Sequence, residues 1–100
     1  NNIEMLNKIV PQDWVNNNEF KTDIMFLWND IDRPKIIDQV IHKPEIETLQ
    51  YLPGALVWHI DRKNVTKSPI LKMVGTSLYK QMTVRNVNTV RKLFSIMETI

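Results

Sequence analysis

The sequence predicts an α+β domain of the ferredoxin-like split βαβ class, with a four-stranded antiparallel sheet and added N- and C-terminal helices. Three patterns predict it: the apolar run "IMFLW", the Pro53-Gly54 pair between two apolar stretches, and a helical period near the end of the chain. At 100 residues the chain is long enough for a single core, so residues 1–100 are expected to form one domain.

Composition excludes several classes of protein. The chain is 43% hydrophobic and 24% charged, which is typical of a globular domain. It has no Cys, so disulfides, thiol catalysis and Cys-ligated metals are excluded. No apolar run is long enough to span a bilayer, so no membrane association is expected. The lack of Cys fits a reducing compartment, and we expect a cytoplasmic protein. Because the chain opens on Asn1 without an initiator Met, we expect a fragment of a longer protein.

Charge is unevenly distributed along the chain. Residues 1–50 hold five Lys/Arg against nine Asp/Glu, whereas residues 51–100 hold eight against two. The pattern favours two halves that interleave and attract each other, the alternative being an anion-facing surface on the second half. No Lys/Arg cluster is dense enough for a nucleic-acid patch, and no aromatic pattern of the kind that stacks RNA bases is present. Nucleic acid is therefore not an expected partner.

The first half begins with an expected helix over residues 3–10, closed by Pro11, and a polar connector follows it. Residues 21–28, "KTDIMFLW", are expected to form a strand. Alternation places one apolar set, Ile24, Phe26 and Trp28, on one face and a second set, Met25 and Leu27, on the other. Because both faces are apolar, this strand is expected to be central and covered on both sides.

A capped helix is predicted within residues 29–44, "NDIDRPKIIDQVIHKP". Asp32 suits the N-cap and Pro34 the first turn, and Pro44 ends the helix. Its buried stripe is expected to consist of Ile36, Ile37, Val40 and Ile41.

A β-hairpin is predicted next, with strands in residues 45–52 and 55–62 around a type II turn at Pro53-Gly54. In its second strand, alternation separates the set Leu56, Trp58 and Ile60 from the set Val57 and His59. A short helix is expected to follow Ser68-Pro69, carrying Ile70, Leu71 and Val74 and ending at Gly75.

Residues 78–84 are expected to form the last strand, and residues 86–100 the last helix. The apolar stripe of that helix is Val87, Val90, Phe94 and Met97, with Leu93 adjoining.

The order of these elements places the first and third strands in the middle of the sheet. Helices of such a fold cover one face only, where we expect Phe26 and Trp58. Met25, Leu27 and Val57 are then expected on the other face, which must be covered by a terminal helix, another domain or another subunit.

A family resemblance adds to this prediction. Residues 51–94 resemble the C-terminal half of an uncharacterised bacterial family, the domain of unknown function numbered 1697. Its T-x-R-N-x-N-T block is matched by Thr83, Arg85, Asn86, Asn88 and Thr89, and its earlier apolar-to-Asp segment by Phe26, Leu27, Asp30 and Asp32. The R-G-I-N-V-G-G and S-G-N motifs of its first half do not occur here. The resemblance therefore implies two related α+β units, of which this chain is the second and an N-terminal sister domain is the partner. It implies no activity, cofactor or catalytic residue.

The segment "TVRNVNTV", residues 83–90, is the first candidate site. Asn86 or Asn88 suits the cap of the last helix, and Thr89 suits its first turn. The alternative is an anion or phosphate site formed by Arg85, Asn86, Asn88 and Thr89, because free N–H groups and the helix dipole attract anions and Arg85 can bind them in a bidentate manner. Arg91 and Lys92 would add positive charge there. Capping is the interpretation that the pattern favours.

Other polar residues give weaker hypotheses. His42 and His59 are far apart in sequence, so no metal site is predicted for them. His59 is interpreted as a surface or interface residue, the alternative being an acid–base group oriented by Asp61 or Asp23. The carboxylates of Asp30 and Asp32 are explained by loop and cap roles rather than by metal binding.

Taken together, these patterns predict a non-enzymatic binding or interaction module without a cofactor, for which the start of the last helix is the candidate site for an anionic small molecule. Homodimerisation remains open. The alternative is half of an inter-domain enzyme site for a phosphorylated or nucleotide-like substrate, with Arg85 as electrophile and His59 as acid–base group. That alternative requires His59 to face Arg85 across a cleft.

Overall fold

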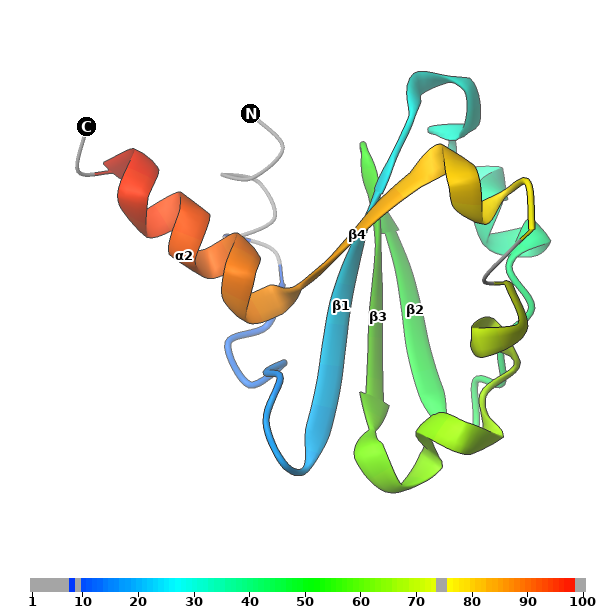
Figure 1. The fold of residues 1–100 in the computed structure, drawn as a ribbon, viewed down its shortest axis with the longest axis horizontal. Coiled ribbons are helices and arrows are strands. Elements are labelled where there is room, and N and C mark those ends of the chain that lie inside the picture. The colour runs from blue at the N-terminus through cyan, green and yellow to red at the C-terminus, as the bar shows by residue number, and fades with distance from the viewer. Residues whose placement is uncertain (1–7, 9, 74–75, 99–100) are drawn as a thin grey trace.

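The computed structural model describes residues 8, 10–73 and 76–98. It contains a four-stranded antiparallel sheet of strands β1 (Phe20–Leu27), β2 (Glu47–Leu52), β3 (Ala55–Asp61) and β4 (Met82–Asn86), in the order β2-β3-β1-β4. The first and third strands are thus central, as the sequence predicted. One α-helix, α2 (Val87–Glu98), follows β4 directly (Figure 1). The chain is therefore α+β, while the N-terminal helix expected over residues 3–10 lies almost wholly outside the described residues.

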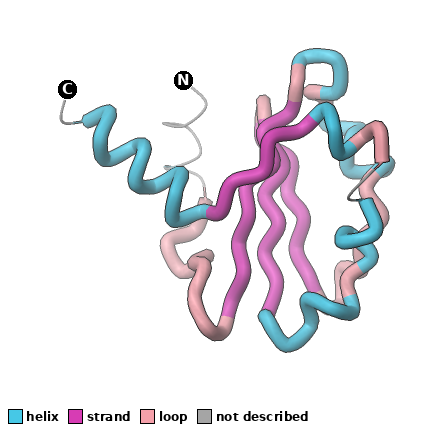
Figure 2. Tube along the Cα trace, viewed as in Figure 1, coloured by secondary structure: helices cyan, strands magenta, loops and turns pink. Residues whose placement is uncertain are grey.

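The connections between strands differ from the prediction. In place of two α-helices they contain short 3-10 turns: η1 (Asn29–Ile31) and η2 (Pro34–Gln39) after β1, and η3 (Arg62–Lys67), η4 (Pro69–Met73) and η5 (Tyr79–Gln81) after β3 (Figure 2). Shorter 3-10 helices thus stand where the sequence predicted helices, η2 within residues 29–44 and η4 after Ser68-Pro69, and Val74 and Gly75 of the second prediction lie outside the described residues.

The physical reason is clearest in η2. Its apolar residues are β-branched, which lowers helix propensity, and six residues are too few for an α-helix to be stable by itself. Its backbone forms i→i+3 bonds, Ile36 N to Arg33 O at 3.0 Å and Val40 N to Ile37 O at 3.2 Å. These tight turns still bury Ile36 and Val40, but they leave Ile41 75% exposed, contrary to the predicted stripe.

The N-cap predicted for Asp32 is also wrong. Arg33 occupies the cap position of η2 and makes no side-chain cap bond, while Pro34 begins the turn as expected. The carboxylate of Asp32 instead holds the hairpin turn, because its Oδ1 accepts hydrogen bonds from Tyr51 Oη and Gly54 N, both at 2.8 Å. Gly54 has φ of 92°, the left-handed value that the predicted Pro-Gly type II turn requires.

The register between β1 and β3 corrects the predicted faces. Ile24 pairs with Val57, and Met25 pairs with Leu56. Directly paired residues of an antiparallel sheet share a face, so Val57 lies with Ile24 and not with Met25. Phe26 and Trp58 consequently lie on opposite faces, against the expectation that they share one. Trp28, expected beside Ile24, follows the end of β1 and is 56% exposed.

Each face has its own core, and both are covered by this chain. On face 1, Met25, Leu27, Leu56, Trp58 and Ile60 pack with residues of the 3-10 turns, Ile31, Ile36 and Ile70 among them. On face 2, Ile24, Ala55 and Val57 pack with Val87 and Val90 of α2 and with Val10 and Trp14 of the N-terminal segment. Figure 1 shows the two covers on opposite sides of the sheet. The start of α2 and the N-terminal segment therefore pack on the second face, which agrees with the predicted alternative of a terminal helix as cover.

The last helix agrees only in part with its predicted stripe. Val87 and Val90 are buried and Phe94 is half-buried, the side chain of Met97 lies outside those described, and the adjoining Leu93 is 43% exposed. The last strand ends at Asn86 rather than Val84, and its expected first residues form η5. Among the described residues, no helix combines the length and the apolar character needed to cross a bilayer.

A buried carboxylate joins the hairpin to the turns on face 1. Glu47 is 5% exposed, and its Oε1 accepts from Trp58 Nε1 and Ser68 Oγ, both at 2.6 Å. Its Oε2 accepts from the backbone N–H of Lys43 at 2.6 Å. The Ser68 hydroxyl oxygen in turn accepts from Ile70 N at 3.1 Å and so begins η4. Three hydrogen-bond donors thus replace the water molecules that would otherwise solvate this carboxylate.

Glu47→Gln is expected to lower the free energy of unfolding by about 2 kcal/mol, because the amide nitrogen must face a donor and the charge of the acceptor is lost. Urea unfolding measures the effect. Glu45→Gln, at an exposed position nearby, is the matched control and should change stability by less than about 0.5 kcal/mol. Equal effects of the two substitutions would contradict the buried network.

Candidate functional site

The predicted anion-binding residues lie together where β4 passes into α2. Arg85 and Asn86 end the strand, Asn88 and Thr89 belong to the first helical turn, and all four are exposed. The Asn86 Oδ1 accepts a hydrogen bond from Thr89 N at 2.9 Å, which is the bond of an N-cap. The geometry therefore matches the capping interpretation, with Asn86 as the N-cap.

The other amide of the motif holds the N-terminal connector, residues 10–18, which we call the strap. Asn88 Nδ2 donates to Asn16 O at 2.9 Å, and Arg91 donates to Pro11 O at 3.0 Å. Arg91 thus binds the strap instead of adding charge to an anion site. The Arg85 guanidinium donates a hydrogen bond to the adjacent carbonyl of Val84 at 2.8 Å and makes none to Asn86, Asn88 or Thr89.

Arg62 fixes the strap from the end of β3. Its guanidinium donates to Asn17 O and to Asn16 Oδ1, and its backbone N–H donates to Glu19 O at 2.8 Å. Side chains from the end of β3 and the start of α2 therefore converge on strap carbonyls. These basic side chains of residues 51–100 therefore bind mainly backbone oxygens of the strap. The ion pairs Lys21–Asp23 and Lys63–Asp61 each join two residues of the same half of the chain.

His59 lies under the strap on face 2. Its ring stacks between Trp14, with centroids 4.7 Å apart and planes 6° apart, and Phe20, with centroids 5.4 Å apart. Its Nδ1 lies 2.8 Å from Thr22 Oγ1, which itself donates to Val15 O at 2.9 Å. Because a hydroxyl has one proton, His59 Nδ1 must be the donor to Thr22. Neutral His59 therefore carries its proton on Nδ1, and Nε2 is the nitrogen that gains a proton on acidification.

The enzyme hypothesis requires a cleft between His59 and Arg85. His59 pairs with Thr22 and Arg85 with Ile24, so His59 and Arg85 share face 2. The His59 ring, however, is enclosed by two aromatic rings, and neither of the pockets described below is lined by His59 or Arg85. The carboxylates proposed to orient His59 are bound elsewhere, Asp61 to Lys63 and Asp23 to Lys21. Within the described part of the chain, no three His, Cys, Asp or Glu side chains gather to hold a metal ion.

A concave site that sequence reasoning missed lies on face 1. We call it the β1 pocket. Its floor is formed by Met25, Trp58 and Val84 from three adjacent strands, and Ile70, Met73 and Tyr79 of the turns line its other side. Lys21 and Asp23 of β1 complete the lining, and the cavity volume is about 170 Å³. Ligand sites have this character: a mainly apolar wall with a few polar groups that fix orientation.

The polar part of the β1 pocket is an ion pair beside an aromatic ring. Lys21 Nζ lies 3.1 Å from Asp23 Oδ2 and 6.0 Å from the centroid of the Trp58 ring. The Trp58 ring is held in place by its bond to the buried Glu47 carboxylate. Alternation alone places Lys21, Asp23 and Met25 on one face of β1, which is the signal that could have found this site. The contribution of Trp58 and Val84 required the register.

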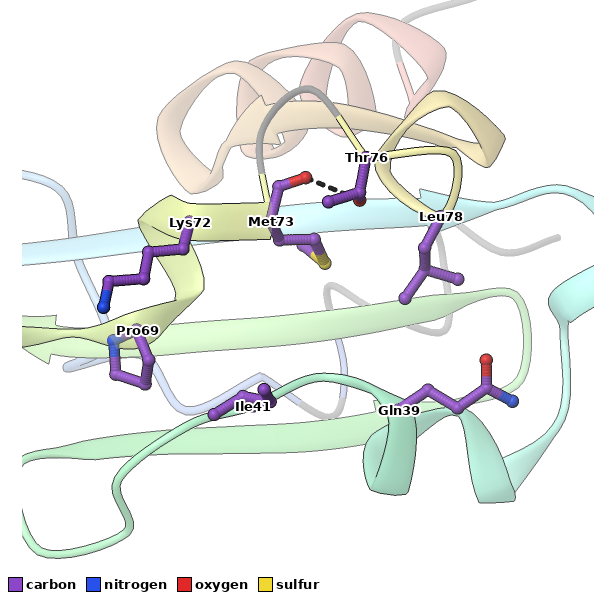
Figure 3. A pocket seen from close by; sticks show the side chains of 7 residues that line it. All are labelled: Gln39, Ile41, Pro69, Lys72, Met73, Thr76 and Leu78. Atoms are coloured by element: carbon purple, nitrogen blue, oxygen red, sulfur yellow. Dashed lines mark hydrogen bonds between the residues drawn. The ribbon is translucent and has the colours of Figure 1, made fainter.

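A second hollow lies between the segment after η2 and the turns after β3. Figure 3 shows Gln39 and Ile41 on one side of it and Pro69, Met73 and Leu78 on the other. Its volume is about 250 Å³. The lining residues stand on both sides of residues 74–75, which are outside the described residues, and no charged pair lies in it. The β1 pocket is therefore the better defined of the two.

Comparisons with protein-family models, with curated proteins and with solved structures find no match, so the family resemblance of residues 51–94 stays a prediction.

Burial lowers the pKa of His59 from its ordinary value of 6.5, an effect that Asp13 partly opposes. The folded state therefore binds fewer protons than the unfolded chain as pH falls below that value. The stability contributed by neutral His59 is present above pH 6.5 and is lost as pH falls through the lowered pKa of the folded state. We expect the free energy of unfolding to decrease over that range.

Urea unfolding at a series of pH values between about 7.5 and 5 measures this decrease in the region where histidine titrates. His59→Asn keeps a donor near the Nδ1 position and removes the titration, so its stability should be lower but its pH slope reduced. His42→Asn is the matched control and should keep the slope. An undiminished slope in His59→Asn would show that the pH dependence has another source.

Proposed function

We propose that this domain is a binding module without catalytic activity of its own, and that its ligand site is the β1 pocket. The observation that supports the proposal is a buried carboxylate, paired with a partly exposed lysine, in the wall of an otherwise apolar hollow. Asp23 is 7% exposed, and Met25, Trp58 and Ile70 around it are buried. Removing a carboxylate from water is costly, and its position at the wall of an open concave surface favours a role in recognition.

The architecture suits such a module. The central strands β1 and β3 place Asp23 and Trp58 directly opposite each other, and β4 adds Val84 at the edge. A site built on paired strands is more rigid than one built on loops alone, because the backbone bonds of the sheet fix the side-chain origins. The turns η4 and η5 supply the opposite wall.

A ferredoxin-like arrangement remains our proposal for the fold class. The strand order β2-β3-β1-β4 supports it, whereas the 3-10 turns replace its two helices. The proposals of a sister domain, of a bacterial source and of a cytoplasmic location rest on the resemblance of residues 51–94 and on the absence of Cys.

A substitution that fills the β1 pocket tests the proposed site. Val84→Phe places a ring into the cavity, and Thr83→Phe, the matched control, places the same ring on the opposite face of the same strand. Single-ring fragments added to the ¹⁵N-labelled protein are expected to shift the amide signals of Met25, Trp58 and Val84 in the wild type and in Thr83→Phe, and not in Val84→Phe. A fragment screen without any shift at these amides would refute the site.

The start of α2 is the second candidate, as an anion site of Arg85, Asn86, Asn88 and Thr89. It is favoured by one observation: the first turn of this 12-residue helix carries no acidic residue, so its positive end is not neutralised from within. Arg85 is exposed beside it. The bonds of Asn86 to Thr89 and of Asn88 to the strap limit the groups that remain for a ligand.

Titration with inorganic phosphate separates the two roles of this segment. If it binds anions, phosphate shifts the amides of residues 87–89 and Arg85→Ala abolishes the shift. If Asn86 only caps, Asn86→Ala lowers stability by about 1 kcal/mol with or without phosphate, and Asn86→Asp does not. Unchanged stability in Asn86→Ala would contradict the cap, and phosphate shifts that persist in Arg85→Ala would contradict the anion site.

A further inference from the structure

We propose that the β1 pocket binds a small organic cation, an alkyl- or arylammonium ion whose apolar body fills the cavity while its charged nitrogen pairs with Asp23. This inference rests on the proposed function and names the chemical class of its ligand.

The first step is that the fixed charge in the pocket wall is negative. Asp23 belongs to β1, one of the two central strands, and its neighbours across the sheet are Trp58 and Asn86. Its side chain is 10% exposed. A short side chain on a central strand has little freedom to leave the site, so the carboxylate is a permanent part of the wall.

The second step is that the positive charge beside it is replaceable. The side chain of Lys21 is 26% exposed and carries its ammonium on a flexible four-carbon stem. When another cation takes its place at Asp23, the carboxylate stays paired and the ammonium of the partly exposed Lys21 can turn into solvent, so the exchange leaves no buried charge unpaired. Lys21 therefore acts as an internal competitor for the position that a ligand would take.

The third step is the aromatic ring beside the carboxylate. The Lys21 ammonium lies 6.0 Å from the Trp58 centroid, at the outer limit of a cation–π contact. A ligand ammonium inside the cavity would take up the same two partners, a carboxylate oxygen and an indole face. The indole is held by Glu47 at 2.6 Å, so it is prepared for contact before a ligand arrives.

Other ligand charges fit less well. An anion would have to draw Lys21 away from Asp23 and would leave the buried carboxylate unpaired next to a like charge, which is strongly unfavourable. A neutral ligand would gain apolar contacts only. The size of the site limits the body of the ligand: a cavity of about 150 Å³ accommodates benzene in a well-studied protein, and this cavity measures about 170 Å³.

Three probes with the same ring test the charge preference: benzylammonium, benzyl alcohol and benzoate. Each is titrated into the ¹⁵N-labelled chain, and the dissociation constant is taken from the shifts of the Met25, Trp58 and Val84 amides. We expect benzylammonium to bind at least about tenfold more tightly than either other probe, which corresponds to about one charge-assisted contact.

Two substitutions with opposite expected effects locate the charge. Asp23→Asn should weaken benzylammonium binding about tenfold and leave benzyl alcohol unchanged, whereas Lys21→Gln should tighten benzylammonium binding by about threefold or more by removing the competitor. Lys35→Gln, at an exposed lysine outside the pocket, is the matched control and should change neither. If Asp23→Asn does not fold, Lys21→Gln alone decides.

The outcomes separate the two proposals. If benzyl alcohol or benzoate binds as tightly as benzylammonium, or if Lys21→Gln weakens or does not change cation binding, the inference is overturned while the pocket remains a binding site. If none of the three probes shifts the pocket amides, the inference and the proposed function fail together.

Discussion

Strand β1 carries apolar side chains on both faces, so each face of the sheet must be covered by other parts of the chain. This requirement determines the arrangement of the whole domain. Ile24 is fully buried and its neighbour Met25 is 2% exposed, although their side chains point in opposite directions. Burial of such a side chain contributes about 1.5 to 3 kcal/mol, so neither face can stay in water without a large loss of stability. The chain meets the requirement with 3-10 turns on one face and with the strap and α2 on the other (Figure 1).

The two covers explain where polar side chains are used and where one concave surface stays open. A strap without regular structure presents backbone carbonyls that need donors. Arg62, Asn88 and Arg91 provide them, which removes those groups from the pool available to a ligand. The short turns on face 1 cover the sheet incompletely, and the β1 pocket lies between these turns and the strands. The polar groups on face 2 are therefore used to hold the strap, whereas the incomplete cover of face 1 leaves the candidate site open.

Local patterns predicted much of this fold, and long-range register limited the rest. Alternation within β1, apart from Trp28 beyond its end, and within β3 was assigned correctly, and so were the Pro-Gly turn and the central position of both strands. The pairing of one strand against the other was not contained in either pattern, and a shift of one residue moves every side chain to the other face. For that reason Val57 was placed with Met25, and the β1 pocket, which draws on three strands, was missed. The helix cap, predicted at Asn86 or Asn88, needed only neighbouring residues, and the structure places it at Asn86.

Nuclear Overhauser contacts in the isolated 100-residue chain test the two-cover account most directly. The account predicts contacts from the Val57 methyl groups to Val87 and Val90, and from the Trp14 ring to the His59 ring, with no contact between Val57 and Ile70. Contacts of Val57 to the turns on face 1, or a Val57 side chain without partners from α2 and the strap, would contradict it.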